Sequence, residues 1–120
     1  MTITGRSKEY YAKNPSYHVE DAEFKWNNFE KTILLSKIDF SKVNSIGEIG
    51  CGSGQILSFA KKSGLFKDTK YVGYDTNPDA IDLAKSLDPS IKYLNEDLIN
   101  TNIEKEFDIL IVSDVFEHVD

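Results

Sequence analysis

A cluster of glycines follows a short apolar stretch near the middle of the chain. The segment Glu48-Ile-Gly-Cys-Gly-Ser-Gly54 places glycines at positions 50, 52 and 54, with an acid two residues before the first. Glycines permit a tight turn and leave no β-carbon between the backbone and an approaching ligand. A dinucleotide loop of the GxGxxG type would need a glycine where Gln55 stands, and the lysine of a P-loop is absent. The spacing GxGxG therefore predicts another kind of ligand-binding loop, with a plain strand-to-helix turn as the alternative.

Acidic and polar side chains follow the other apolar stretches in a similar way. Asp75 ends the stretch KYVGYD, 21 residues after Gly54, and its carboxylate could accept hydrogen bonds from two vicinal ribose hydroxyls. Asp97 follows the next stretch and could accept a hydrogen bond from an adenine amine, although it could also be a simple loop residue. Ligands of open α/β sheets bind beyond the carboxyl ends of the strands, so these groups are predicted to surround one site.

The segment after the most apolar stretch carries a different set of groups. Asp114, Glu117 and His118 stand at positions i, i+3 and i+4, which share one face if a helix begins there. Two carboxylates and an imidazole could bind a divalent cation that lowers the pKa of a substrate hydroxyl. Alternatively, His118 could act as a general base or orient the substrate. We take His118 as the candidate catalytic residue and assign no metal site.

Taken in order, these motifs resemble those of the class I S-adenosylmethionine-dependent methyltransferases, over residues 44–120. EIGCGSG resembles the first family motif, whose glycine loop lies under the methionine part of the cofactor. GYDTNPDAI resembles the second, in which the acid holds the ribose, and FDILIVSDVFEHV resembles the fourth, whose strand end lines the methyl-transfer site through residues such as Ser113. The resemblance implies S-adenosylmethionine as the cofactor. The cofactor-binding residues that it implies are Glu48, Gly50, Cys51, Gly52, Gly54, Asp75, Thr76, Asp97, Leu98 and Ser113.

The resemblance also bears on the reaction and on the extent of the chain. The DxxEH pattern of residues 114–118 is similar to a motif of ubiquinone-biosynthesis O-methyltransferases, which favours transfer to an oxygen of a small molecule. The family's sheet usually has seven strands, so about three strands are expected to be missing after Asp120. Two other functions stay open. One is a cofactor-binding fragment without activity, and the other is a nicotinamide-dependent oxidoreductase, which Gln55 disfavours.

The hydrophobic pattern predicts the elements that must position these groups. Helices are expected over 19–38, 55–63 and 78–87, and strands over 46–49, 70–75, 91–94 and 107–113. Gly64 is placed to end the second helix and Asn77 to begin the third. This alternation predicts an α/β fold, a Rossmann-like doubly wound parallel sheet. The resemblance implies the strand order 3-2-1-4, with residues 1–40 as an N-terminal helical segment and 41–120 as an incomplete cofactor-binding domain.

Three expectations concern packing at the ends of the chain. In the first helix, Trp26 belongs to an apolar stripe and is expected in the core, whereas Tyr11 and Tyr17 could cover the cofactor pocket. The run Ile109-Leu-Ile-Val112 predicts a strand covered on both faces. Its outer edge is expected to be unpaired, which would allow self-association through this strand.

The net charge of the chain and its distribution indicate which classes of binding partner to expect. The 120 residues carry a net charge of −6, and residues 75–120 hold three basic against twelve acidic side chains. Such a surface would repel a phosphate backbone, so nucleic acid is not expected as a partner. A small molecule is expected as the methyl acceptor. The sequence shows no membrane span or signal peptide, and a single cysteine, Cys51, fits a reducing compartment, so a cytoplasmic protein is expected.

Overall fold

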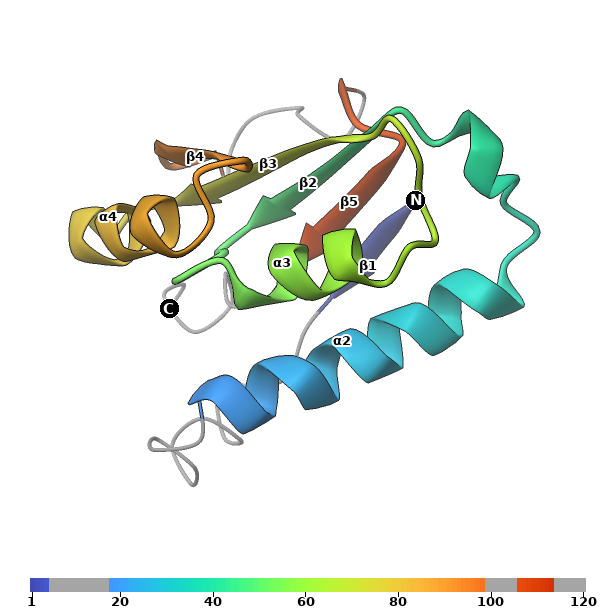
Figure 1. The fold of residues 1–120 in the computed structure, drawn as a ribbon, viewed down its shortest axis with the longest axis horizontal. Helices are drawn as coiled ribbons and strands as arrows, with labels where there is room; N and C mark the ends of the chain where they lie inside the picture. The colour runs from blue at the N-terminus through green and yellow to red at the C-terminus, as the bar shows by residue number, and fades with distance from the viewer. Residues whose placement is uncertain (5–17, 99–105, 114–120) are drawn as a thin grey trace.

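The computed structural model describes residues 1–4, 18–98 and 106–113. In chain order the elements are β1 (Thr2–Thr4), α2 (His18–Leu35), the 3-10 helix η1 (Phe40–Lys42), β2 (Ser45–Ile49), α3 (Gln55–Lys62), β3 (Lys70–Asp75), α4 (Pro78–Leu87), β4 (Lys92–Asn95) and β5 (Ile109–Val112). The strands form one parallel sheet in the order β1-β5-β2-β3-β4. Figure 1 shows α2, α3 and α4 together on one face of this sheet.

The sheet topology brings the carboxyl ends of β2 and β5 side by side. From β2 the chain moves outward through β3 to β4, and it then returns to pair β5 with the other side of β2. The order β4-β3-β2-β5 is the predicted order 3-2-1-4, which is therefore confirmed. Ligands of such sheets bind where the strand order reverses, which here is the end of β2.

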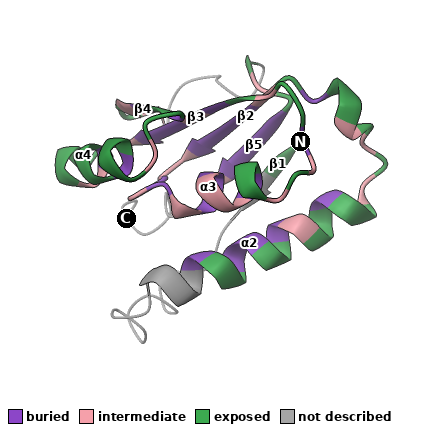
Figure 2. Cartoon of the chain, viewed as in Figure 1, coloured by how far each residue is buried: buried purple, intermediate pink, exposed green. Residues whose placement is uncertain are grey.

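The helix-covered face holds the main core. In α2 the predicted stripe of Ala22, Trp26, Phe29 and Ile33 is buried and packs in the same cluster as the inward-facing residues of the sheet (Figure 2), so the core position expected for Trp26 is confirmed. The helix ends at Leu35 rather than near residue 38. The Ser36 amide donates to the carbonyls of the preceding turn, and its hydroxyl donates to the Ile33 carbonyl, which closes the last turn.

The ends of the shorter helices follow their predicted signals. Gly64, just after α3, has a φ of 73°, the left-handed conformation expected of a residue that ends a helix. At the start of α4, the Asn77 side chain accepts hydrogen bonds from the amides of Asp79 and Ala80, at 3.0 and 3.4 Å. Both signals are local, so they could be predicted without knowledge of the tertiary packing.

The interior strand β5 is buried on both faces, as predicted. Ile109 and Ile111 face the helices, Leu110 faces the other way, and none of the three is more than 3% exposed. The strand is shorter than the predicted range 107–113. The carboxylate of Asp108 accepts hydrogen bonds from the amides of Asn44 and Ser45, where the chain enters β2, and the paired register of β5 with β2 begins at Ile109.

The outer edge of β5 is paired, so the expectation of an unpaired edge is wrong. Thr2–Thr4 of β1 lie parallel to Leu110–Val112, and the Leu110 amide donates to the Met1 carbonyl at 2.6 Å. Three residues are too few to show the alternation that predicts a strand, which is why β1 was missed. Within the described ranges no helix is long and apolar enough to cross a membrane.

Candidate functional site

The loop between β2 and α3 has the geometry that only glycine adopts readily. Gly50, Gly52 and Gly54 have φ values of 76°, 55° and 82°, in the left-handed region. The amides of Gly50 and Cys51 both donate to the Tyr74 carbonyl, at 2.8 and 3.0 Å. The Gly54 amide closes a turn onto the Cys51 carbonyl at 3.0 Å. The loop is therefore folded tightly against the end of β3, with its shape set by backbone hydrogen bonds.

One position of this loop faces open space. Among the residues that the structure describes, a β-carbon built on Gly52 would meet no atom within 4 Å beyond its chain neighbours, whereas one on Gly54 would overlap the Tyr93 hydroxyl. The half-buried Gly52 is therefore the place where a ligand could approach the loop backbone directly. This geometry fits S-adenosylmethionine, the cofactor that the sequence resemblance implies, because a ligand that contacts the backbone directly needs a surface without side chains.

Asp75, at the end of β3, is bonded directly to the loop. Its Oδ2 accepts the Gly52 amide at 2.9 Å, and its Oδ1 accepts the Asn77 amide at 2.8 Å. The Asn95 side chain of β4 donates to the Asp75 backbone carbonyl at 2.8 Å. A carboxylate has about four acceptor positions, so these two bonds leave room for two hydroxyl donors. Asp75 thus both fixes the loop and remains able to bind a ligand.

Glu48 and Ser113 form a buried connection between the ends of β2 and β5. Glu48 is fully buried and Ser113 is 2% exposed. The Ser113 hydroxyl lies 2.6 Å from Oε2 of Glu48 and 2.8 Å from the Gly50 carbonyl. These contacts place both side chains under the first glycine of the loop. Their contribution to a ligand site stays a prediction, and the structure shows that they support the loop.

The remaining predicted residues occupy different environments. Thr76 is exposed beside Asp75, and Asp97 is exposed beyond the end of β4. Leu98 is half-buried and packs on the sheet face opposite the helices. Cys51 is buried in the helix-side core. The candidate catalytic residue His118, together with Asp114 and Glu117, lies outside the described residues, as do Tyr11 and Tyr17.

Sequence reasoning missed Tyr93, which the structure places behind the loop. Its side chain is 2% exposed, and its hydroxyl donates to the Gly54 carbonyl at 3.1 Å. Burial, and secondarily the nearby negative charge of Glu48, raises the pKa of Tyr93 above its usual value. The hydroxyl therefore stays protonated and acts as a donor. The alternation of residues 92–95 could have predicted which face of its strand Tyr93 lies on. It could not have predicted the contact of Tyr93 with Gly54, which is 39 residues away in the chain.

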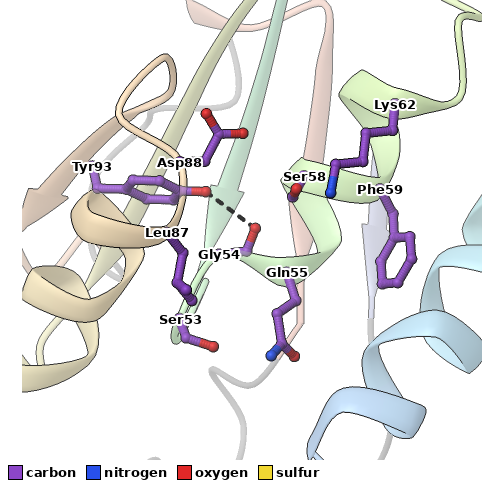
Figure 3. Close-up of a pocket in the computed structure, with 9 residues that line it drawn as sticks. All are labelled: Ser53, Gly54, Gln55, Ser58, Phe59, Lys62, Leu87, Asp88 and Tyr93. Carbon is purple, nitrogen blue, oxygen red and sulfur yellow. Dashed lines mark hydrogen bonds between the residues drawn. The ribbon is translucent and has the colours of Figure 1, made fainter.

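A pocket of about 230 Å³ opens on the helix side of the loop. Figure 3 shows it between α3 and the end of α4, with Tyr93 at its inner wall and its hydroxyl bonded to Gly54. Ser53, Gln55 and Leu87 also line it, whereas Asp75 and Ser113 do not. The pocket therefore borders the glycine loop at Ser53 and Gly54 without including the Asp75 carboxylate.

Comparison with known proteins identifies the family. A family model described as a methyltransferase domain matches residues 48–120, from the acid before the glycine loop onward. The chain is also 28% identical over 110 residues to 235L, a protein of Invertebrate iridescent virus 6 whose name proposes a methyltransferase. That alignment covers 92% of this chain and 37% of the viral protein.

Solved structures share the fold. The plantazolicin methyltransferase BpumL, determined in complex with SAH, is similar with a TM-score of 0.63 and 21% identity over 88% of this chain and 39% of its own. DesVI from Streptomyces venezuelae is similar with a TM-score of 0.55 and 16% identity, over 87% and 39%. The chain spans less than two fifths of the length of each of these relatives. Because the family model covers more than half of the chain, the chain belongs to the methyltransferase domain family, as its motifs predicted.

Proposed function

We propose that this chain binds S-adenosylmethionine and provides the cofactor side of methyl transfer to a small molecule, with oxygen as the acceptor atom. One observation carries the proposal: the open Gly52 position lies next to the Asp75 carboxylate, at the end of β2 where the strand order reverses. Membership of the methyltransferase family and the SAH-bound relative BpumL support the choice of ligand.

In this proposal, different residues bind different parts of the cofactor. The loop Gly50–Gly54 lies under the methionine part, and the remaining acceptor positions of Asp75 bind the two ribose hydroxyls. Asp97 accepts a hydrogen bond from the adenine amine. Thr76 and Leu98, which directly follow Asp75 and Asp97 in the chain, contact the ligand beside these two acids. Ser113 acts from beneath through its contact with the Gly50 carbonyl, and Glu48 acts through its contact with the Ser113 hydroxyl.

When bound, the cofactor supplies a methyl group on a positively charged sulfur, and this sulfur is the leaving group when the acceptor attacks the methyl carbon in line. The protein's task is to align donor and acceptor and to exclude water, which is why no nucleophile of its own is needed. The imidazole of His118 is our candidate to accept the proton from the acceptor hydroxyl. The preference for oxygen rests on the resemblance of residues 114–118 to O-methyltransferases.

A cofactor-binding unit without activity of its own is the second candidate. It is favoured by one fact, namely that the chain spans only 37% of the length of the viral relative. The two candidates share the same cofactor site and differ only in whether these 120 residues include a complete acceptor site.

Isothermal titration tests the proposal. The purified chain should bind S-adenosylmethionine and its demethylated product, and should not bind NAD. Binding of NAD alone, or of none of the three, would refute it. Incubation with radiolabelled cofactor and a panel of phenols and catechols then separates an active enzyme from a binding unit.

A further inference from the structure

Tyr93 reaches the glycine loop by crossing a strand that has no side chain in its way. In the sheet register Tyr93 of β4 pairs with Gly73 of β3, which in turn pairs with Glu48 of β2. Side chains paired across parallel strands point to the same face. A β-carbon on Gly73 would lie 2.6 Å from a ring carbon of Tyr93, so only glycine leaves room for the ring. The ring therefore extends over β3 toward the loop that follows β2.

The Tyr93 hydroxyl then contacts the point where the loop becomes a helix. Gly54 precedes the first residue of α3, and its carbonyl accepts the Ser58 amide at 3.1 Å as the first bond of the helix. The same carbonyl accepts the Tyr93 hydroxyl at 3.1 Å (Figure 3). The opposite end of the loop is held by the Tyr74 carbonyl and its middle by Asp75. The Tyr93 hydroxyl is thus the third contact that fixes the loop, after those of the Tyr74 carbonyl and the Asp75 carboxylate.

We propose that Tyr93 is a positioning residue that holds the loop Gly50–Gly54 in its ligand-binding shape, acting through the Gly54 carbonyl. The proposal rests on the proposed function, because it assigns Tyr93 an effect on cofactor affinity. Glycines with positive φ have many alternative conformations, so a loop with three of them loses much freedom when a ligand orders it. An anchor present before binding reduces that loss and so raises the affinity.

The test compares two buried tyrosines on the same face of the sheet. Tyr93→Phe removes the hydroxyl and keeps the ring over Gly73. Tyr71→Phe is the matched control, because Tyr71 is also buried in the helix-side core but lies four residues before the end of β3. Titration with SAH should show about three- to tenfold weaker binding for Tyr93→Phe, the effect of one hydrogen bond, and no change for Tyr71→Phe.

Amide hydrogen exchange supplies a readout that a merely structural role would not change. The Ser58 amide should exchange faster in Tyr93→Phe, because its acceptor carbonyl has lost an anchor, while amides of β2 and β5 keep their rates. Gly73→Ala, which displaces the ring, should reproduce this local change. If Tyr93→Phe binds SAH as wild type does, or if exchange rises equally in all elements, the role of Tyr93 is refuted. If the wild-type chain itself does not bind SAH, the proposed function fails instead.

Discussion

Asp75 has two tasks at once, and a ligand analogue can separate them. Its carboxylate holds the amides of Gly52 and Asn77, and in the proposed function it also binds the ribose hydroxyls. Asp75→Ala should weaken SAH binding by about 1.5–3 kcal/mol, the value of a hydrogen bond to a charged group. Asp82→Ala, which removes an exposed acid from α4, should leave the affinity unchanged.

Calorimetry with a 2′-deoxy analogue of SAH completes this prediction. Because the analogue lacks one hydroxyl, the loss caused by Asp75→Ala should be smaller for it than for SAH. An equal loss for both ligands would show that Asp75 acts only by holding the loop, and the ribose assignment would be withdrawn.

The open side of Gly52 leads to a second prediction with an internal control. Gly52 and Gly64 both have positive φ, and within the described part of the chain a β-carbon at either position would meet no atom within 4 Å beyond its chain neighbours. Substitution by alanine should therefore strain both sites by a similar amount, about 1–2 kcal/mol. Only the methyl group at position 52 would stand where the ligand approaches. Gly52→Ala should weaken SAH binding at least about tenfold, while Gly64→Ala should lower the melting temperature similarly and bind normally.

The outcome is read from affinity and melting temperature together. Normal binding by Gly52→Ala in a folded protein would mean that the loop is only a strand-to-helix turn. A loss of binding in both variants would mean that global destabilisation, rather than a blocked approach, is the cause.

At the scale of the elements, sequence prediction succeeded where the signal was local. The sequence signals for the helix start at Asn77, the helix end at Gly64 and the glycine loop each lie within a few neighbouring positions. Prediction failed where the cause was a distant partner. β1 forms only because the edge of β5 is available, and Tyr93 reaches Gly54 only because Gly73 of the intervening strand has no side chain.

Helix α2 shows how a helix predicted as a separate N-terminal segment becomes part of the core. Ile33 is 1% exposed and packs with the sheet, whereas Leu35 of the same helix is 86% exposed. Ile33→Ala should lower the free energy of unfolding by about 2–5 kcal/mol, because it leaves a cavity. Leu35→Ala should change it by less than about 0.5 kcal/mol.

Urea unfolding followed by two probes measures this difference. If α2 and the sheet are one cooperative unit, Trp26 fluorescence and far-ultraviolet circular dichroism should give the same midpoint in Ile33→Ala. Two separate transitions would show that α2 unfolds independently of the sheet.

At the scale of the whole molecule, β1 decides whether the sheet ends in an exposed apolar strand. The strand β5 is the most buried of the sheet, and on its outer side it pairs with three residues from the start of the chain. An exposed edge of this kind would present unpaired backbone groups beside apolar side chains, a common cause of association between chains. The self-association expected from the sequence is therefore predicted to occur only when β1 is detached.

Ile3→Pro tests that prediction. Ile3 pairs with Ile111, and proline at the centre of a three-residue strand cannot donate a backbone hydrogen bond to the ladder. Light scattering at micromolar concentration should show a monomer for wild type and for the control Ile3→Val, which keeps the backbone donor and the strand preference. Ile3→Pro should form dimers or larger species whose fraction rises with concentration. A monomeric Ile3→Pro with unchanged circular dichroism would show that β5 does not associate even when its edge is free, and a wild-type dimer would show that β1 does not protect it.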